Sequence, residues 1–261
     1  MIRRSVFISL VFLLFLASTA EARARVISLS PTSTEIIARI QKHSQLVAVT
    51  NLCDYPEHVK SLPKIDGMSP QYEKILIMEP DYIVGVGNGP QVEKKLKNLR
   101  LKTMVLPFPN SVSELKSQIL KIGTFIEEED GARQLISEMN KELRNLHRSR
   151  SQSKPKALVI LWLSPTTVIG GQSFVSELMT LGGLENVMKD NPMTHTRLSR
   201  ESLFEKNPEL VILANPALLK TAESDLILRD KRLVSHILPH LFLRPGPRII
   251  EGIKAFRELT L

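Results

Sequence analysis

The sequence predicts an α/β protein with two similar lobes and one long connecting helix. Residues 73–86 are echoed by residues 201–213, because each segment has a Glu, a Pro seven residues later and then a β-branched run. Proline stops a helix and favours extended geometry before it, so each copy predicts a short helix followed by a buried strand. In addition, the tetrapeptide at 29–32 recurs at 163–166, and a long amphipathic stretch covers residues 128–150 between the two halves.

Residues 1–24 have the pattern of a secretory signal peptide. Arg3 and Arg4 precede an apolar run at residues 6–17, and small residues follow that run. The run is short for a membrane span, so we expect cleavage within residues 20–24 and export of a soluble mature chain. An uncleaved anchor is the alternative. No cysteine at the end of the run supports lipid attachment.

The composition predicts a folded, weakly basic protein without an internal disulfide. The 261 residues are 43% hydrophobic, which suffices for one large core or two smaller ones. Removal of residues 1–24 takes three basic residues and one acidic residue from the chain's 35 and 27, leaving a net charge of +6. The basic residues are dispersed and not interleaved with aromatics, which argues against nucleic-acid binding. Cys53 is the single cysteine, so packing must stabilise the fold.

The first predicted strand, at residues 26–29, runs directly into a predicted helix. Thr32 and Glu35 have capping-box spacing ahead of an apolar series that begins at Ile36. A helix N-terminus at the carboxyl end of a strand is where open α/β sheets bind ligands. An ordinary turn between strand and helix is the alternative.

The rest of the first lobe alternates predicted strands, loops and helices. The Gly-Asn-Gly loop at 87–89 lacks a third glycine and a nearby ribose-binding acid, so a tight turn explains it better than a dinucleotide site. Ser111 and Glu114 form a second capping box. The other predicted elements are strands at 46–49, 82–86 and 104–108, a polar loop at 51–56, turns at 63–70, and helices at 91–99 and 111–126.

A long helix at 128–150 is predicted to separate the lobes. Its apolar residues share one face, and at 1.5 Å per residue it spans about 30 Å, the width of a small domain. In the second lobe, strands at 156–163 and 167–169 precede a helix at 173–181 that Gly182 and Gly183 close. The predicted organisation is a signal peptide at 1–24, a first lobe at 25–127, the connecting helix at 128–150, and a second lobe at 151–261, with polar residues 149–155 at the boundary.

Six segments match, in order and spacing, the motifs of one known family. They are RVISLSPTSTEI from Arg25, CDYP from Cys53, EKILIMEPDYIV from Glu73, VIGGQSFVSELMTLGGLENV from Val168, RLSRESL from Arg197 and RPGPRIIEGI from Arg244. Through them, nearly all of residues 25–259 resembles the periplasmic substrate-binding proteins of cobalamin, haem and ferric-siderophore importers, most of all the cobalamin-binding members. The resemblance implies two Rossmann-like α/β lobes joined by one interdomain helix, with the ligand between the lobes and little hinge motion.

The resemblance further implies that Glu73 and Glu201 dock the protein onto an inner-membrane ABC permease. Similar proteins present one Glu from each lobe to permease arginines, and these two residues hold the matching positions. Carboxylates at equivalent places on two lobes suit a two-fold symmetric partner, and charge pairing supplies register and on-rate. The alternative is that both residues merely favour helix N-termini through the macrodipole.

A set of ligand-lining residues is also implied. Corrin, haem and siderophore ligands are large, and flat rings are commonly held by aromatic faces, which Trp162 and Tyr55 supply. Where cobalamin binders usually place further aromatics, this chain has Leu52, Met68 or the glycine before it, and His195. The full implied set is Ser30, Pro31, Thr32, Leu52, Tyr55, Gly67, Met68, Asn88, Trp162 and His195.

His195 has one more implied role, as an axial ligand to the metal of a bound corrin or haem, because a neutral imidazole suits both cobalt and iron. A polar loop histidine is the alternative. We expect no cofactor and no resident metal site. His236 and His240 lie four residues apart, but Pro239 between them argues against a helix that presents both together.

The sequence therefore predicts a non-catalytic, monomeric periplasmic receptor that delivers a cobalamin-like corrinoid to an inner-membrane ABC importer. The second hypothesis keeps this class and changes the ligand to haem or a ferric siderophore. An exported α/β enzyme is the third hypothesis. It is disfavoured because the sequence has no GxSxG elbow, no Cys/His pair in a supporting context and no phosphate-binding loop.

Overall fold

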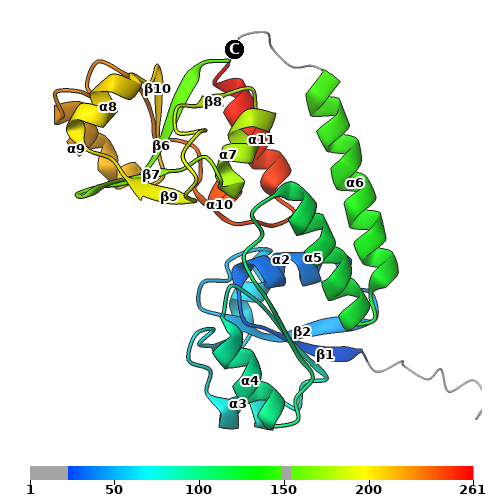
Figure 1. Ribbon diagram of the computed structural model, residues 1–261. Helices are drawn as coiled ribbons and strands as arrows, with labels where there is room; N and C mark the ends of the chain where they lie inside the picture. Colours follow the sequence, from blue (N-terminus) through cyan, green and yellow to red (C-terminus); the bar gives the residue numbers. More distant parts are fainter. Residues whose placement is uncertain (1–22, 149–153, 261) are drawn as a thin grey trace, which may run out of the picture.

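Two α/β lobes are stacked, and one long helix runs beside both of them (Figure 1). The computed structural model describes residues 23–148 and 154–260. The predicted signal peptide lies almost wholly outside these ranges, as does most of the boundary predicted at 149–155. Within the described ranges, no helix is both long and apolar enough to cross a membrane.

The first lobe, here called the N lobe, contains a parallel five-stranded sheet in the order β3-β2-β1-β4-β5. Because all five strands point the same way, the loops that follow them gather at one edge, here called the carboxyl edge. The strands are β1 (Ala24–Ser28), β2 (Ser44–Thr50), β3 (Lys64–Ile65), β4 (Tyr82–Val86) and β5 (Thr103–Leu106); the helices are α2 (Pro31–Ile40), α3 (Tyr72–Ile77), α4 (Pro90–Asn98) and α5 (Val112–Phe125), with a 3-10 turn at Glu57–Ser61.

Helices cover both faces of the N-lobe sheet. Val26 and Val84 pack in the core beneath α2 and α5, whereas Ile27 and Ile83 pack on the opposite face with α3 and α4. Successive side chains of a strand point to opposite faces, so strands covered on both sides need continuous apolar runs. This explains why all five residues of β4 are buried.

The second lobe, here called the C lobe, contains a mixed sheet rather than a parallel one. Strands β6, β10 and β11 are parallel, whereas β7 and β9 run antiparallel to their neighbours. The order is β11-β10-β6-β7-β9, with β8 beside β6. The strands are β6 (Lys156–Leu163), β7 (Thr166–Ile169), β8 (Glu185–Asn186), β9 (His195–Arg197), β10 (Leu210–Leu213) and β11 (Arg232–Val234); the helices are α7 (Phe174–Leu181), α8 (Arg200–Lys206), α9 (Leu219–Ser224), α10 (His240–Leu243) and α11 (Ile249–Glu258), with a 3-10 turn at Pro216–Leu218.

Of the two sequence repeats, one corresponds to a structural repeat and the other does not. The helix–Pro–strand repeat is confirmed, because α3 leads into β4 in the N lobe and α8 leads into β10 in the C lobe. The tetrapeptide repeat is misleading. Residues 29–32 open helix α2, but residues 163–166 form the turn of a hairpin in which Leu163 lies opposite Thr166. In the C lobe the chain turns back as the antiparallel strand β7 where the N lobe begins a helix.

The N-cap of helix α2 lies two residues before the cap predicted at Thr32. Ser30 is the N-cap, and its Oγ accepts a hydrogen bond from the Ser33 amide at 3.2 Å. Pro31 takes the first helical position, where its missing N–H has no intrahelical partner in any case. The predicted cap is therefore wrong, and Glu35 has a different role that involves the other lobe.

Two other helix ends agree with prediction. Ser111 caps α5, because its Oγ accepts a hydrogen bond from the Glu114 amide at 3.0 Å. Gly182 follows α7, and Gly183 has a φ of +91°, which lies in the left-handed region that favours glycine.

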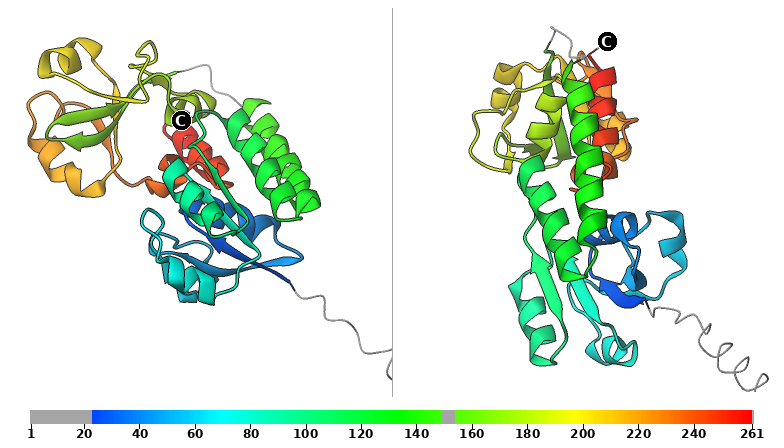
Figure 2. Two further views of the ribbon diagram at one scale, coloured as in Figure 1. Left: turned by 60° about the horizontal axis from the view of Figure 1, so that its bottom comes forward. Right: turned by 90° about the vertical axis from the view of Figure 1, so that its right-hand side faces the viewer.

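The long predicted helix is α6 (Glu129–Arg148), and it contacts both lobes (Figure 2). Near its middle, Glu138 forms an ion pair of 2.9 Å with Arg39 of α2. Further along, Glu142 forms an ion pair of 2.8 Å with Lys254 of α11. One helix thus packs on the N lobe with its first half and on the C lobe with its second half.

Candidate functional site

Most of the residues predicted to line a ligand cleft lie at the carboxyl edge of the N-lobe sheet. Ser30 follows β1, Leu52 follows β2, Gly67 follows β3 and Asn88 follows β4. Parallel strand direction brings these four loops to the same edge, although up to 58 residues separate them in the chain. Open α/β sheets bind ligands at this edge.

The Asn88 side chain ties three of these loops together. Its Nδ2 donates to the carbonyl oxygens of Leu29 at 2.7 Å and Gly67 at 2.8 Å. Asn88 is only 5% exposed, so its amide hydrogens serve the loops and not the surface. Gly67 is required in this arrangement, because a Cβ there would lie 2.3 Å from the Leu29 carbonyl oxygen.

The predicted residues Ser30 and Thr32 are also buried in the loop scaffold. Ser30 Oγ accepts from the Val86 amide at 3.1 Å, in addition to capping α2, and thereby joins the loop after β1 to the end of β4. Thr32 is buried within the first turn of α2, next to the partly exposed Pro31. The Ser30 side chain therefore holds two loops together.

Large apolar side chains extend from this scaffold towards solvent. Leu52, Tyr55 and Met68, all predicted ligand residues, belong to the exposed large hydrophobic residues of the chain. Phe108, which the sequence did not suggest, joins them from the loop after β5. A pocket of about 380 Å³ lies between Phe108 and the loop at 87–90.

In the C lobe, Trp162 and His195 lie on one side of the same sheet. Trp162 near the end of β6 pairs with Thr167 of β7, which pairs with Arg197 of β9. Paired residues share a face, and so do residues two apart on one strand, so Trp162, Arg197 and His195 point to the same side. All three are exposed. In Figure 1, β7 and β9 form the side of the C lobe that faces the N lobe.

His195 lies in strand β9 and not in the loop that was the alternative prediction. Its Nδ1 lies 3.1 Å from the hydroxyl of Thr194. Its neighbour Arg197, which sequence reasoning missed, adds a cation to the same face. Arg197 could have been found from the alternation of side chains along a strand, but β9 has only three residues, and so short a strand shows no recognisable alternation in the sequence.

An ion-pair cluster joins the two lobes beside Tyr55. Arg248, at the start of α11, donates to both carboxylate oxygens of Glu35 in α2, at 3.0 and 2.8 Å. Its guanidinium also lies over the Tyr55 ring, 4.0 Å from the ring centroid. Arg244 pairs with Asp54 at 2.5 Å and donates to the Leu52 carbonyl oxygen at 3.3 Å. The C lobe is therefore bonded directly to the loop that carries two predicted ligand residues.

Charge inside this cluster shifts the pKa values of its members. The hydrogen bond from Arg244 lowers the pKa of Asp54 despite some burial. Burial alone would lower the pKa of Arg248, but its hydrogen bond and attraction to Glu35 raise it above the ordinary value. Burial, followed by repulsion from Arg248 and Arg244, lowers the pKa of His240. At neutral pH the lowered pKa keeps the His240 imidazole neutral, and the lowered pKa of Asp54 keeps its carboxyl group ionised.

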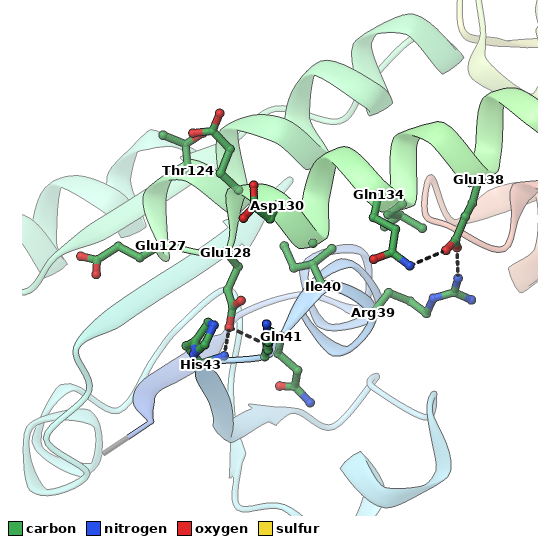
Figure 3. A pocket seen from close by; sticks show the side chains of 14 residues that line it. Arg39, Ile40, Gln41, His43, Thr124, Glu127, Glu128, Asp130, Gln134 and Glu138 are labelled. Atoms are coloured by element: carbon green, nitrogen blue, oxygen red, sulfur yellow. Dashed lines mark hydrogen bonds and ion pairs between the residues drawn. The ribbon is translucent and has the colours of Figure 1, made fainter. Parts of the chain in front are cut away.

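A second pocket, of about 840 Å³, lies at the opposite edge of the N-lobe sheet (Figure 3). Its floor is the turn before β2, where Glu128 Oε1 accepts from the amides of Lys42 at 2.7 Å, His43 at 2.6 Å and Ser44 at 2.7 Å. None of the predicted ligand residues lines this pocket. The Glu128 carboxylate is used in fixing the start of α6 to the turn before β2, so we assign this pocket a structural role.

The remaining predicted residues, Glu73 and Glu201, lie on two short helices. Glu73 is exposed in the first turn of α3, and Glu201 is exposed in the first turn of α8. Among the described residues, no group of three or more His, Cys, Asp or Glu side chains forms a candidate metal site. Cys53 is buried with a free thiol, which lies 3.1 Å from the hydroxyls of Thr34 and Thr50.

The fold and this arrangement define a class of protein. Two α/β lobes are linked by a single long helix, the N lobe exposes Leu52, Tyr55, Met68 and Phe108 in its loops, and the C lobe exposes Trp162 on the face of its sheet that carries His195. Such a construction binds a bulky ligand between lobes. The chain belongs to the periplasmic binding protein family, whose model matches residues 26–238.

The chain is also similar to individual proteins, in sequence or in structure. It is 25% identical over 249 residues to the uncharacterized ABC transporter substrate-binding lipoprotein YvrC of Bacillus subtilis, covering 90% of this chain and 79% of that one. It is 27% identical over 200 residues to the vitamin B12-binding protein of Yersinia pestis, covering 75% and 71%. The crystal structure of the periplasmic haem-binding protein HutB of Vibrio cholerae superposes with a TM-score of 0.78 at 21% identity, covering 90% and 98%.

The chain is thus a substrate-binding transport protein of the periplasmic binding protein family and not an enzyme. The resemblance in its motifs and the predicted fold class are confirmed.

Proposed function

We propose that this protein captures a cobalamin-like corrinoid between its lobes in the periplasm and delivers it to an inner-membrane ABC importer. The observation that carries the proposal is the apolar, aromatic lining on both sides: Tyr55 and Phe108 from the N lobe and Trp162 from the C lobe. Flat macrocycles bind through contact with such faces. The relative named as a vitamin B12-binding protein supports the corrinoid as ligand.

The assignment of individual contacts follows from exposure. Leu52, Tyr55, Met68 and Trp162 provide the faces that touch the macrocycle, whereas Asn88 and the other buried residues of the carboxyl edge shape the loops. His195 stands on the same face of the C-lobe sheet as Trp162, where a neutral imidazole would reach the metal of the ligand.

Haem or a ferric siderophore is the second candidate ligand. The structural similarity to a haem-binding protein favours haem, and the exposed Met193, two residues before His195, adds a thioether sulfur as a further iron donor at that end of the C-lobe sheet. The ion-pair cluster and α6 join the lobes at two separate places, so we expect either ligand to bind with little hinge motion.

Delivery requires docking, and we assign it to Glu73 and Glu201. Both carboxylates are exposed at the second residue of a short helix, and both helices precede a Pro and a central strand of their own lobe. Two equivalent acidic points suit a two-fold symmetric permease with basic side chains. Residues 1–24 act as the signal that exports the chain, and a single copy of the mature chain binds the permease.

The test is a titration of the purified mature protein with cyanocobalamin, haemin and a ferric siderophore. Trp162 is the single tryptophan, so its emission reports directly on a chromophore bound between the lobes. Calorimetric heat and quenching with cyanocobalamin alone support the corrinoid. Binding of haemin alone identifies the second candidate, and no binding of any of the three overturns the proposed function. The visible spectrum of the protein as purified distinguishes corrin from haem independently.

A further inference from the structure

The two short helices that carry Glu73 and Glu201 share a second feature besides the carboxylate. Three residues after each Glu stands a large apolar side chain in solvent: Leu76 is 44% exposed and Phe204 is 72% exposed. Residues three apart on a helix are surface neighbours, with about 5–6 Å between their Cβ atoms. Each lobe therefore presents a carboxylate with an apolar side chain directly beside it.

Both helices are held in the same orientation on their lobes. The residue between each pair is buried, Ile75 in the N lobe and Leu203 in the C lobe. This single buried contact turns the Glu and its apolar neighbour outward together. The two helices are equivalent in structure as well as in sequence, since α3 and α8 both lead into a buried central strand. The two copies of the tetrapeptide repeat, in contrast, form different structures.

The carboxylates remain available to a partner. Within residues 23–148 and 154–260, no ion pair involves Glu73 or Glu201. Hydrogen bonds from its own amide and the Ser199 hydroxyl, together with Arg200, lower the pKa of Glu201 and keep it ionised. Arg200 itself is held by Asp225 at 2.6 Å. A cation on the partner can therefore pair with Glu73 or Glu201 without displacing a cation of this protein.

We propose that Leu76 and Phe204 are apolar anchors of the docking surface, each inserting into an apolar pocket beside a basic side chain on one subunit of a two-fold symmetric permease. This inference rests on the proposed function. It adds the part of the surface that slows dissociation of the protein from the permease. Exposed charges govern encounter rate and register, while desolvated apolar side chains dominate the dissociation rate. Two equivalent patches with the same order of carboxylate and apolar residue require a partner that offers the same receptor twice.

The two patches are not identical in composition. Ile77, four residues after Glu73, is exposed, whereas the matching position in the C lobe is Glu205. The N-lobe patch is therefore the more apolar, and the C-lobe patch depends on Phe204 alone.

The test measures binding of the purified protein to the ABC importer of the cobalamin, haem and siderophore class from the same cells, held in nanodiscs. The variants are Leu76→Gln, Phe204→Gln and the pair combined, with Leu76→Met and Phe204→Leu as conservative partners. Leu99→Gln is the surface control, because Leu99 is similarly exposed but lies at the end of α4. Each Gln variant is expected to bind about tenfold more weakly through faster dissociation, whereas the conservative variants and Leu99→Gln stay within about threefold.

Melting temperature and Trp162 emission are expected to match those of the parent protein in every variant, since Leu76 and Phe204 are exposed. If the double Gln variant binds like the parent while Glu73→Ala with Glu201→Ala binds weakly, the anchors are wrong and the docking assignment stands. If Leu99→Gln weakens binding as much as Phe204→Gln, the anchors are also wrong. If the parent protein does not bind the importer, the docking assignment and this inference both fail.

Discussion

Arg248 donates two hydrogen bonds, of 3.0 and 2.8 Å, to the carboxylate of Glu35, which lies 213 residues earlier in the chain. Glu35 belongs to α2 of the N lobe and Arg248 stands at the start of α11 in the C lobe. Together with α6, this contact joins the lobes at a second place, beside the loop that exposes Tyr55. The relative position of the two ligand-facing surfaces therefore depends on charged residues at the lobe boundary.

Removal of Arg248 should destabilise the protein strongly. Glu35 is 3% exposed, so Arg248→Met leaves a buried carboxylate whose nearest remaining cation is Arg244 at 3.7 Å. Breaking a buried pair from one side costs about 3 kcal/mol or more in the free energy of unfolding. Urea unfolding followed by far-UV circular dichroism measures the loss.

The matched control is Lys60→Met, which removes an ion pair of 2.7 Å with the exposed Glu57. Exposed pairs contribute about 0–1 kcal/mol. A loss for Arg248→Met no larger than that of the control would contradict the buried role of the pair.

Acidification should weaken the lobe contact through His240. Its pKa is lowered in the folded protein by burial and by Arg248 and Arg244, while Asp54 and Glu35 act in the opposite direction. The folded state therefore takes up this proton less readily than the unfolded state. The stabilisation is fully present above the ordinary pKa near 6.5 and is lost as the pH falls through the lower folded value.

Melting temperatures of the parent protein and of His240→Gln between pH 7.5 and pH 5 measure this dependence. The parent curve should fall below pH 6.5 more steeply than the variant curve, since the variant lacks the titrating imidazole. The lowered pKa of Asp54 acts in the same direction at lower pH, below its ordinary value of 3.8. Parallel curves for the two proteins would exclude His240 as the titrating group.

Asn88→Ala should loosen the carboxyl edge of the N-lobe sheet. The substitution leaves the carbonyl oxygens of Leu29 and Gly67 without their donor, at a cost of about 2 kcal/mol in the free energy of unfolding. Asn98→Ala, at an exposed position in α4, is the control and should be neutral. Equal unfolding midpoints for the two variants would show that Asn88 does not hold the loops.

Trp162→Ala should weaken ligand binding without affecting the fold. The indole is 59% exposed, so its loss costs little stability but removes the largest aromatic face on the C lobe. We expect affinity for the ligand identified by titration to fall about tenfold or more, with Trp162→Phe intermediate. Calorimetry measures both, and unchanged affinity in Trp162→Ala would place the ligand elsewhere.

Glu73→Ala combined with Glu201→Ala should uncouple ligand binding from transport. Both side chains are exposed and neither belongs to the proposed ligand-lining set, so ligand affinity should remain within about twofold. Binding to the importer in nanodiscs should weaken, and the loss should be larger at low salt because the contact is ionic. Uptake in cells at the parental rate would contradict the docking assignment.

Local patterns predicted most of the elements that position the site. The strands at 26–29 and 82–86, the helix at 111–126 and the long helix were visible because their apolar residues recur at fixed spacing. The short strands β3, β8, β9 and β11 were not visible, because two or three residues cannot show a period. The tetrapeptide repeat misled for a related reason, since four residues do not determine whether the next element is a helix or a returning strand.

The sequence by itself determined the class of the fold, because helix–Pro–strand repeats, capping residues and apolar periodicity are local properties of the chain. Its motifs also supplied the candidate docking carboxylates and two of the exposed aromatics, Tyr55 and Trp162, but not Phe108. Only the tertiary structure decided what Glu35, Asn88 and Arg248 do. The roles of these residues come from partners that lie 59 and 213 residues away, and such contacts exist only after the strands have aligned and the lobes have met.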